Sequence, residues 1–180
     1  MPAETVMSGT LTNLTSTPLK VNDARLAGKN FMKRETCTAT TGKTSGGFYG
    51  FFRIPASAII VSCELSCDAL STSTAADIGL WEVSNPFAPV TTAGGISNSS
   101  QYFGAAVSLA SALTKQQQLI QSSWTTRAKM TGKRVWEILG LAADPSQSAN
   151  GSVEYDVVAT NTTTITAGGV IVLEISYKMP

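Results

Sequence analysis

Two pairs of carboxylates have a spacing that could support acid–base chemistry. Glu64 and Asp68, and likewise Glu154 and Asp156, would each share one face of an extended strand. Paired carboxylates hydrolyse glycosides when one has a raised pKa and the other stays ionised. In both segments the apolar residues occupy the opposite face, so we expect these carboxylates to lie on solvated surface. A hydrolase with Glu64 or Glu154 as the general acid is the less favoured alternative.

The chain has no histidine among its 180 residues, so it lacks the side chain that titrates nearest neutral pH and that most often ligates metals. Cys37, Cys63 and Cys67 have no histidine to complete a zinc site. In a strand, Cys63 and Cys67 would stand roughly 13 Å apart, too far for a disulfide. We interpret the cysteines as small buried residues of a protein in a reducing compartment. The sequence predicts a protein that is not an enzyme and that uses no cofactor or metal.

Two further patterns could belong to binding sites. The tract TGKT at 41–44 resembles the end of a phosphate-binding loop, but Cys37 stands where that motif requires a glycine, so we interpret the tract as a solvated loop. Trp81, Trp124 and Trp136 could stack on sugars, and a carbohydrate-binding module is therefore an alternative. Trp81 and Trp136 lie in apolar segments typical of a core, whereas we expect Trp124 to be exposed.

The charge of the chain argues against a nucleic-acid or membrane partner. The formal net charge is +1 and only 14% of the residues are charged, which creates no strong global field. The basic residues also lack interleaved aromatic residues for base stacking. No segment combines a basic start with an apolar core, and none approaches the about 18 apolar residues of a membrane span. We expect neither a signal peptide nor a membrane-spanning segment.

Residues 1–46 differ in composition from the rest of the chain. Their apolar residues are scattered without a helical or strand period, and positive charge is concentrated there. This composition is typical of an extended arm that buries little of its own surface and becomes ordered on a partner. The candidate partner-binding residues are Leu11, Leu14, Leu19, Lys20, Val21, Arg25, Leu26, Lys29, Lys33 and Arg34.

Residues 47–180 carry the strand and turn signals of one body. In the segment 58–68, strict alternation places Ile59, Val61, Cys63, Leu65 and Cys67 on one face, which we expect to be buried. The other expected strands cover 48–54, 76–83, 153–159 and 170–177. A Thr-rich connector with a Gly-Gly pair predicts that the last two strands form a hairpin.

Helical spacing is present in two places. Apolar residues over 129–139 predict a helix that ends at Gly140 as a left-handed cap, with Leu141 packing back on Trp136. Weaker helical spacing covers 101–113. Together with the strands, these segments predict a mainly β fold: an antiparallel β-sandwich or jelly roll with one or two short helices and an extended N-terminal arm.

The order of these segments resembles that of small structural proteins of tailed bacteriophages. The resemblance is carried by GFYGFFRIPASAIIVSCEL at 47–65, ADIGLWEV at 76–83, VWEILGLAADP at 135–145 and YDVVATNTTTITAGGVIVLEISY at 155–177. It rests on the pattern of the body and not on an invariant functional motif, so it brings no catalytic residues. The resemblance implies a virion component and, within that class, a capsid decoration (cement) protein.

That resemblance implies the major capsid protein as the partner, bound across neighbouring capsid subunits, and a homo-oligomer such as a dimer or trimer. The protein would be made in the cytoplasm of the bacterial host and would lie on the capsid surface. We expect the arm at 1–46 to provide the main capsid contact. Other virion parts, namely tail, neck or fibre-associated proteins, are the alternative within the same class.

Overall fold

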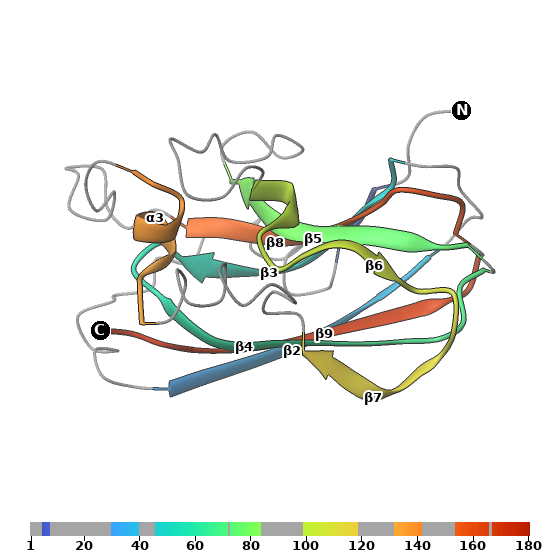
Figure 1. Ribbon diagram of the computed structural model, residues 1–180, viewed down its shortest axis with the longest axis horizontal. Coiled ribbons are helices and arrows are strands. Elements are labelled where there is room, and N and C mark those ends of the chain that lie inside the picture. Colours follow the sequence, from blue (N-terminus) through green and yellow to red (C-terminus); the bar gives the residue numbers. More distant parts are fainter. Residues whose placement is uncertain are drawn as a thin grey trace.

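The computed structural model describes residues 5–7, 30–39, 46–71, 73–83, 99–118, 132–141, 154–165 and 167–180. These residues form two β-sheets that lie one above the other as a sandwich (Figure 1). Neighbouring strands are antiparallel except for β1 and β3, which pair in parallel. The prediction of a mainly β, antiparallel sandwich is confirmed.

The first sheet has five strands and the second has four. The five-stranded sheet has the order β1 (Thr5–Met7), β3 (Phe48–Pro55), β8 (Glu154–Asn161), β5 (Ala75–Glu82) and β6 (Gly104–Ser108). The four-stranded sheet has the order β2 (Asn30–Thr38), β9 (Val170–Lys178), β4 (Ile59–Cys67) and β7 (Leu113–Gln118). Two short helical elements, η2 (Ser99–Gln101) and α3 (Val135–Ile138), complete the described part.

The core lies between the sheets and follows from residue alternation. In β9, Ile171, Leu173 and Ile175 are buried, whereas the intervening residues are half-buried on the opposite face. These side chains join one apolar cluster with Phe52 and Leu80 of the five-stranded sheet. Burial of each such side chain contributes about 1.5–3 kcal/mol to folding. The alternation therefore fixes which face of each strand turns toward the other sheet.

Residues 30–38, which we expected to belong to the extended arm, instead form β2 and pair with β9 from Asn30↔Lys178 to Thr38↔Val170. The inward-facing positions of β2 carry Lys33 and Glu35 in addition to Phe31 and Cys37. Because two of these positions are charged, the sequence shows no apolar period of two. The sandwich therefore includes 30–39 as well as the expected body, and the boundary predicted at residue 46 must move toward the N-terminus.

The predicted hairpin of the last two strands is wrong, because β8 and β9 lie in different sheets. The side chain of Asn161, at the end of β8, holds the corner where the chain leaves the first sheet. Its Oδ1 accepts a hydrogen bond from the N–H of Gly47, and its Nδ2 donates to the carbonyl of Thr163. The Thr-rich connector therefore crosses from one layer of the sandwich to the other.

The predicted helix over 101–113 is also wrong. This segment contains the end of η2, the strand β6 and the first residue of β7. In β6, Val107 is buried while Ala105, Ala106 and Ser108 are exposed, and Ser108 pairs with Ala75 of β5. Gly104 and Ser108, two small residues of this segment, thus belong to an edge strand.

The second predicted helix exists but is shorter than expected. Within the described residues of that segment, the helix covers only Val135–Ile138. Gly140 has the predicted left-handed backbone, with φ = +74°, a conformation that glycine adopts without steric cost. The N–H of Leu141 then donates to the carbonyl of Trp136 at 3.1 Å. The helix cap was therefore predicted correctly from the sequence.

Candidate partner-binding surface

Two candidate contact residues fall within the described part of the chain, and they lie on opposite faces of strand β2. Lys33 points toward the opposite sheet, where its Nζ donates to the carbonyl of Arg53 at 2.6 Å and lies 5.9 Å from the centre of the Tyr177 ring. Burial lowers the pKa of the Lys33 ammonium, and the nearby Glu154 carboxylate acts in the opposite direction. Arg34 lies on the outer face and is exposed. Lys33 thus joins the two sheets, and Arg34 is available to a partner.

The remaining candidate contact residues lie outside the described part of the chain. They are Leu11, Leu14, Leu19, Lys20, Val21, Arg25, Leu26 and Lys29. The segment that contains them, 8–29, connects two strands that are both paired within the sandwich, because β1 pairs with β3 and β2 pairs with β9. Both ends of this segment are therefore fixed to the sandwich.

The outer face of the four-stranded sheet presents its side chains in rows that run across the strands. One row contains Met32 of β2, Ser176 of β9 and Ser62 of β4, with Val61 beside Ser62. Met32 is 69% exposed and Val61 is 55% exposed, and they are the large apolar side chains that the described residues leave exposed. Met32 and Val61 lie on the two strands that flank β9, with Ser176 between them, and they line one hollow.

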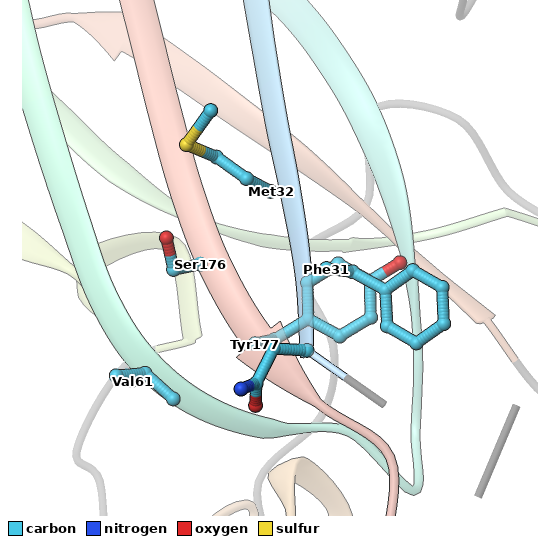
Figure 2. Close-up of a pocket in the computed structure, with 6 residues that line it drawn as sticks. Phe31, Met32, Val61, Ser176 and Tyr177 are labelled. Atoms are coloured by element: carbon cyan, nitrogen blue, oxygen red, sulfur yellow. The ribbon is translucent and has the colours of Figure 1, made fainter. Parts of the chain in front are cut away.

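A shallow hollow of about 300 Å³ lies at this row, lined by Asn30, Phe31, Met32, Val61, Ser176 and Tyr177. Figure 2 shows Met32, Ser176 and Val61 on three neighbouring strands, with the Phe31 and Tyr177 rings close together beside them. These two rings stack with their centres 5.3 Å apart. The stacked rings thus line the hollow beside the exposed Met32 and Val61 side chains.

The prediction that Ile59 and Val61 share the buried face with Cys63 and Leu65 is wrong, because Val61 is exposed and Ile59 pairs with the outward-facing Lys178. The pairing of β4 with β9 shifts register between Ile60 and Ser62, so Val61 is the extra residue of a β-bulge. The bulge turns Val61 outward while Ile60 pairs with the buried Tyr177. A bulge of this kind is not visible in the sequence pattern.

The row next to Met32 is charged. Arg34, Glu174 and Glu64 lie opposite one another on β2, β9 and β4. The row on the other side of Met32 contains Asn30, Lys178 and the half-buried Ile59, and Lys178 is exposed. The outer face of this sheet thus has an apolar row between rows of different charge.

The two predicted carboxylate pairs have different surroundings. Asp68 is exposed and Glu64 is half-buried on the outer face, and the Asp68 carboxylate accepts a hydrogen bond from the N–H of Val170 at 3.0 Å. Asp156, which we expected on solvated surface, is only 5% exposed. Glu154 and Asp156 both face one arginine, and Asp156 is hydrogen-bonded to it.

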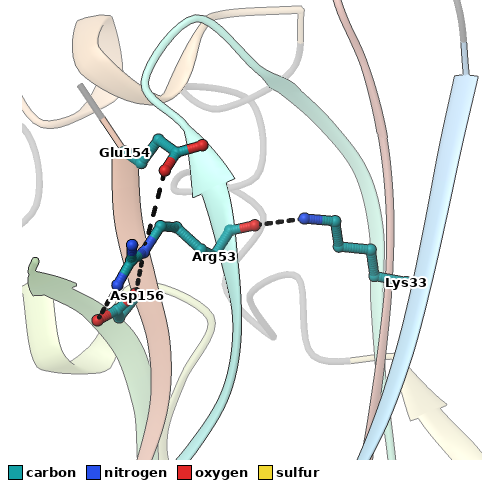
Figure 3. A network of polar contacts seen from close by, with 4 residues as sticks. All are labelled: Lys33, Arg53, Glu154 and Asp156. Carbon is teal, nitrogen blue, oxygen red and sulfur yellow. Dashed lines mark hydrogen bonds and ion pairs between the residues drawn. The ribbon is translucent and has the colours of Figure 1, made fainter. Parts of the chain in front are cut away.

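That arginine is Arg53, whose Nε lies 2.7 Å from Oδ1 of Asp156 and 4.0 Å from Oε2 of Glu154. Figure 3 shows the Arg53 side chain turned toward these two carboxylates, while its backbone carbonyl points to Lys33. Arg53 and Asp156 lie opposite each other on β3 and β8. Because the two opposite charges are in direct contact within the fold, we assign Asp156 a structural role.

The three cysteines are free and buried, as predicted. Burial raises the pKa of Cys37 to about 12 and also raises the pKa of Cys63 and of Cys67. Thiols with such pKa values are protonated at neutral pH and are poor nucleophiles. The Cys37 thiol instead donates to the carbonyl of Gly50 at 3.2 Å, which gives a second polar link between β2 and β3.

The remaining candidate binding residues are the three tryptophans and the tract at 41–44. Trp81 is buried and Trp136 is half-buried against the core, as expected. Trp124 and the tract at 41–44 lie outside the described residues. Across the described ranges, no group of three or more His, Cys, Asp or Glu side chains is arranged to hold a metal ion. Within those same ranges, no helix has the length and apolarity to cross a bilayer.

Comparison with solved structures identifies a shared fold. A chain of the capsid of Ralstonia phage GP4 superposes with a TM-score of 0.62 at 16% sequence identity, covering 98% of this chain and 98% of that chain. A chain of the cyanophage Pam1 capsid asymmetric unit gives a TM-score of 0.49 at 13% identity, covering 91% of this chain and 99% of that chain. No protein-family model matches the sequence, and no curated protein matches it. The likeness to the GP4 chain shows that the two chains have the same fold.

Proposed function

We propose that this protein is a structural component of a bacteriophage virion and that it decorates the capsid by binding across neighbouring major capsid subunits. The observation that carries the proposal is the end-to-end likeness to a chain of the Ralstonia phage GP4 capsid, with a TM-score of 0.62 over 98% of both chains. Since a fold alone does not define a function, the chemistry of the described residues must also fit the role.

The polar groups of the sandwich fit a scaffold. Asp156 pairs with Arg53, Lys33 donates to a backbone carbonyl, and the Asp77 carboxylate accepts hydrogen bonds from Gln101 Nε2 at 3.0 Å and from the N–H of Ala106 at 2.8 Å. Each of these groups is engaged within the fold. This arrangement supports a role in binding and not in catalysis.

The segment 8–29 is the proposed main contact with the capsid. It contains the scattered apolar and basic residues Leu11, Leu14, Leu19, Lys20, Val21, Arg25, Leu26 and Lys29. Its flanking strands β1 and β2 are both paired. A segment fixed at both ends has fewer conformations to lose on binding than a free arm of equal length, which lowers the entropic cost of docking. Contacts to two capsid subunits would then add by avidity.

The copy number of the protein in purified virions tests this function. Quantitative mass spectrometry of particles of the phage that encodes the chain should give a fixed ratio to the major capsid protein, because decoration repeats with the capsid lattice. A small number of copies, set by the symmetry of a tail or neck, would instead assign the protein to those parts. Its absence from purified particles would overturn the virion role altogether.

A further inference from the structure

The outer face of the four-stranded sheet has a symmetry in its side chains that suits a second copy of the same face. Ser176 lies at the centre of the apolar row, between Met32 and the pair Ser62 and Val61. Along β9, Glu174 and Lys178 lie two residues to either side of Ser176, roughly 6–7 Å away in each direction. Both point outward, since the residues between them are buried.

This spacing makes the face complementary to itself. If a second copy is placed on the face after a half-turn about an axis along the Met32–Ser176 row, each row meets the row on the other side of the axis. Lys178 of one copy then faces Glu174 of the other, and this contact occurs twice. Met32 and Val61 meet their own counterparts at the axis. Strands related in this way are antiparallel, which suits the aligned packing of two sheets.

We propose that the protein forms a two-fold symmetric dimer through this outer face, with Met32 and Val61 as apolar anchors and with reciprocal Lys178–Glu174 ion pairs. The exposure of Met32 and Val61, at 69% and 55%, provides the apolar centre that such an interface needs. The charged rows on each side provide the polar rim and set the register. This inference does not rest on the proposed capsid function.

The edge of the same sheet is less suited to a second copy. β2 is an edge strand, and a bare edge can pair with another strand. However, its inward positions carry Lys33 and Glu35, and inward charges on an edge strand are a known device against edge-to-edge pairing. The face, and not the edge, is therefore the surface that we assign to the dimer.

Sedimentation equilibrium of the full-length protein tests the proposal. The wild-type protein should be a dimer, and the variant M32E/V61E should raise the dimer Kd by about a hundredfold or more, because the interface would then bury carboxylates without partners. The control T38E adds one carboxylate, compared with the two of the test variant, to an exposed residue at the far end of β2, opposite Val170. It should leave the Kd unchanged. Unaltered thermal unfolding of the dissociated variant shows that it remains folded.

Charge exchange gives an independent readout of the register. K178E should weaken the dimer by about tenfold, since two opposite-charge contacts become like-charge contacts. E174K/K178E should recover most of the wild-type affinity, because the pairs form again with reversed charge. A wild-type monomer, a trimer, or a dimer that is unaffected by M32E/V61E would overturn the proposal. Failure of the double exchange to recover affinity would overturn the Lys178–Glu174 register.

Discussion

At the level of single residues, the pair Arg53–Asp156 places two buried charges on the face of the five-stranded sheet that is turned away from the core. The side chains are each 7% exposed and their closest atoms lie 2.7 Å apart. A buried pair of this kind adds little net stability when both partners are present, but removal of one partner leaves a buried charge without compensation. The pair therefore acts mainly to hold β3 and β8 in register.

The substitution D156N should lower the free energy of unfolding by about 3 kcal/mol, because the buried Arg53 charge then keeps only the more distant Glu154 carboxylate, 4.0 Å away. Urea denaturation measures this loss. D68N is the matched control: Asp68 is exposed, and an asparagine oxygen can still accept the hydrogen bond from Val170. That control should change stability by no more than about 0.5 kcal/mol.

Replacement of both partners by apolar residues separates charge from packing. R53M/D156L should recover most of the stability lost in D156N, since no charge is then left buried. Equal stability of D156N and the wild-type protein would contradict the structural role assigned to Asp156.

Sequence reasoning at this scale succeeds where one face of a strand is apolar and fails where both faces are buried. Cys63 and Leu65 were placed in the core correctly because their outward neighbours are polar. Asp156 was misplaced because β8 is the central strand of its sheet and is buried on both faces. Val61 and Ile59 were misplaced because the bulge at Val61 shifts the alternation of β4, so that Ile59 pairs with the outward-facing Lys178, and the sequence pattern does not show the bulge.

At the level of elements, β2 determines where the sandwich begins. Its side chains alternate in the usual way, but the inward set includes Lys33 and Glu35. The Lys33 ammonium satisfies a carbonyl of β3 at 2.6 Å, in the part of β3 beyond its pairing with β1. β2 is thus an edge strand whose inward side chains are partly polar. Its sequence therefore shows no apolar period, which is why we expected it to belong to the arm.

Neighbouring residues of β2 provide a test of this placement. K33E should lower the free energy of unfolding by at least about 2 kcal/mol, because a carboxylate would replace the donor to the Arg53 carbonyl. R34E, on the exposed face, should cost no more than about 1 kcal/mol, the range of a like-charge cross-strand pair with Glu174. Chemical denaturation of both variants gives the comparison. If both substitutions left stability unchanged, β2 would not be part of the folded sandwich.

The connections between elements were the hardest part of the fold to predict. β8 and β9 each alternate clearly and are joined by turn-forming residues, which favours a hairpin. In the structure the two strands belong to different sheets, and the side chain of Asn161 at the end of β8 binds Gly47, from a distant part of the sequence. Strand positions therefore follow from local sequence, whereas the assignment of strands to sheets depends on contacts between residues far apart in the chain.

At the level of the whole molecule, we propose two separate contact regions. One is the segment 8–29 between β1 and β2, which we propose contacts the capsid. The other is the outer face around Met32 and Val61, which we propose forms a dimer. A dimer would present two capsid-binding segments, and simultaneous attachment of both would increase the apparent affinity.

Substitution within the segment 8–29 tests its proposed contact with the capsid. Removal of residues 1–46 would also remove β2 and damage the sandwich, so the full chain is required. In the test variant, the apolar residues of the segment are replaced by serine: Leu11, Leu14, Leu19, Val21 and Leu26. Its thermal unfolding should match that of the wild-type protein, while its binding to capsids should fall sharply because the apolar contacts are lost.

Co-sedimentation with capsid shells that lack the protein is the most direct measurement of the central claim. Shells of the phage that encodes the chain are titrated with the purified full-length protein and pelleted. The account predicts that the wild-type protein pellets with the shells and saturates at a fixed ratio to the major capsid subunits, whereas the serine variant stays mostly in the supernatant. Wild-type protein that remains in the supernatant at every concentration, while the shells themselves pellet intact, would contradict the account.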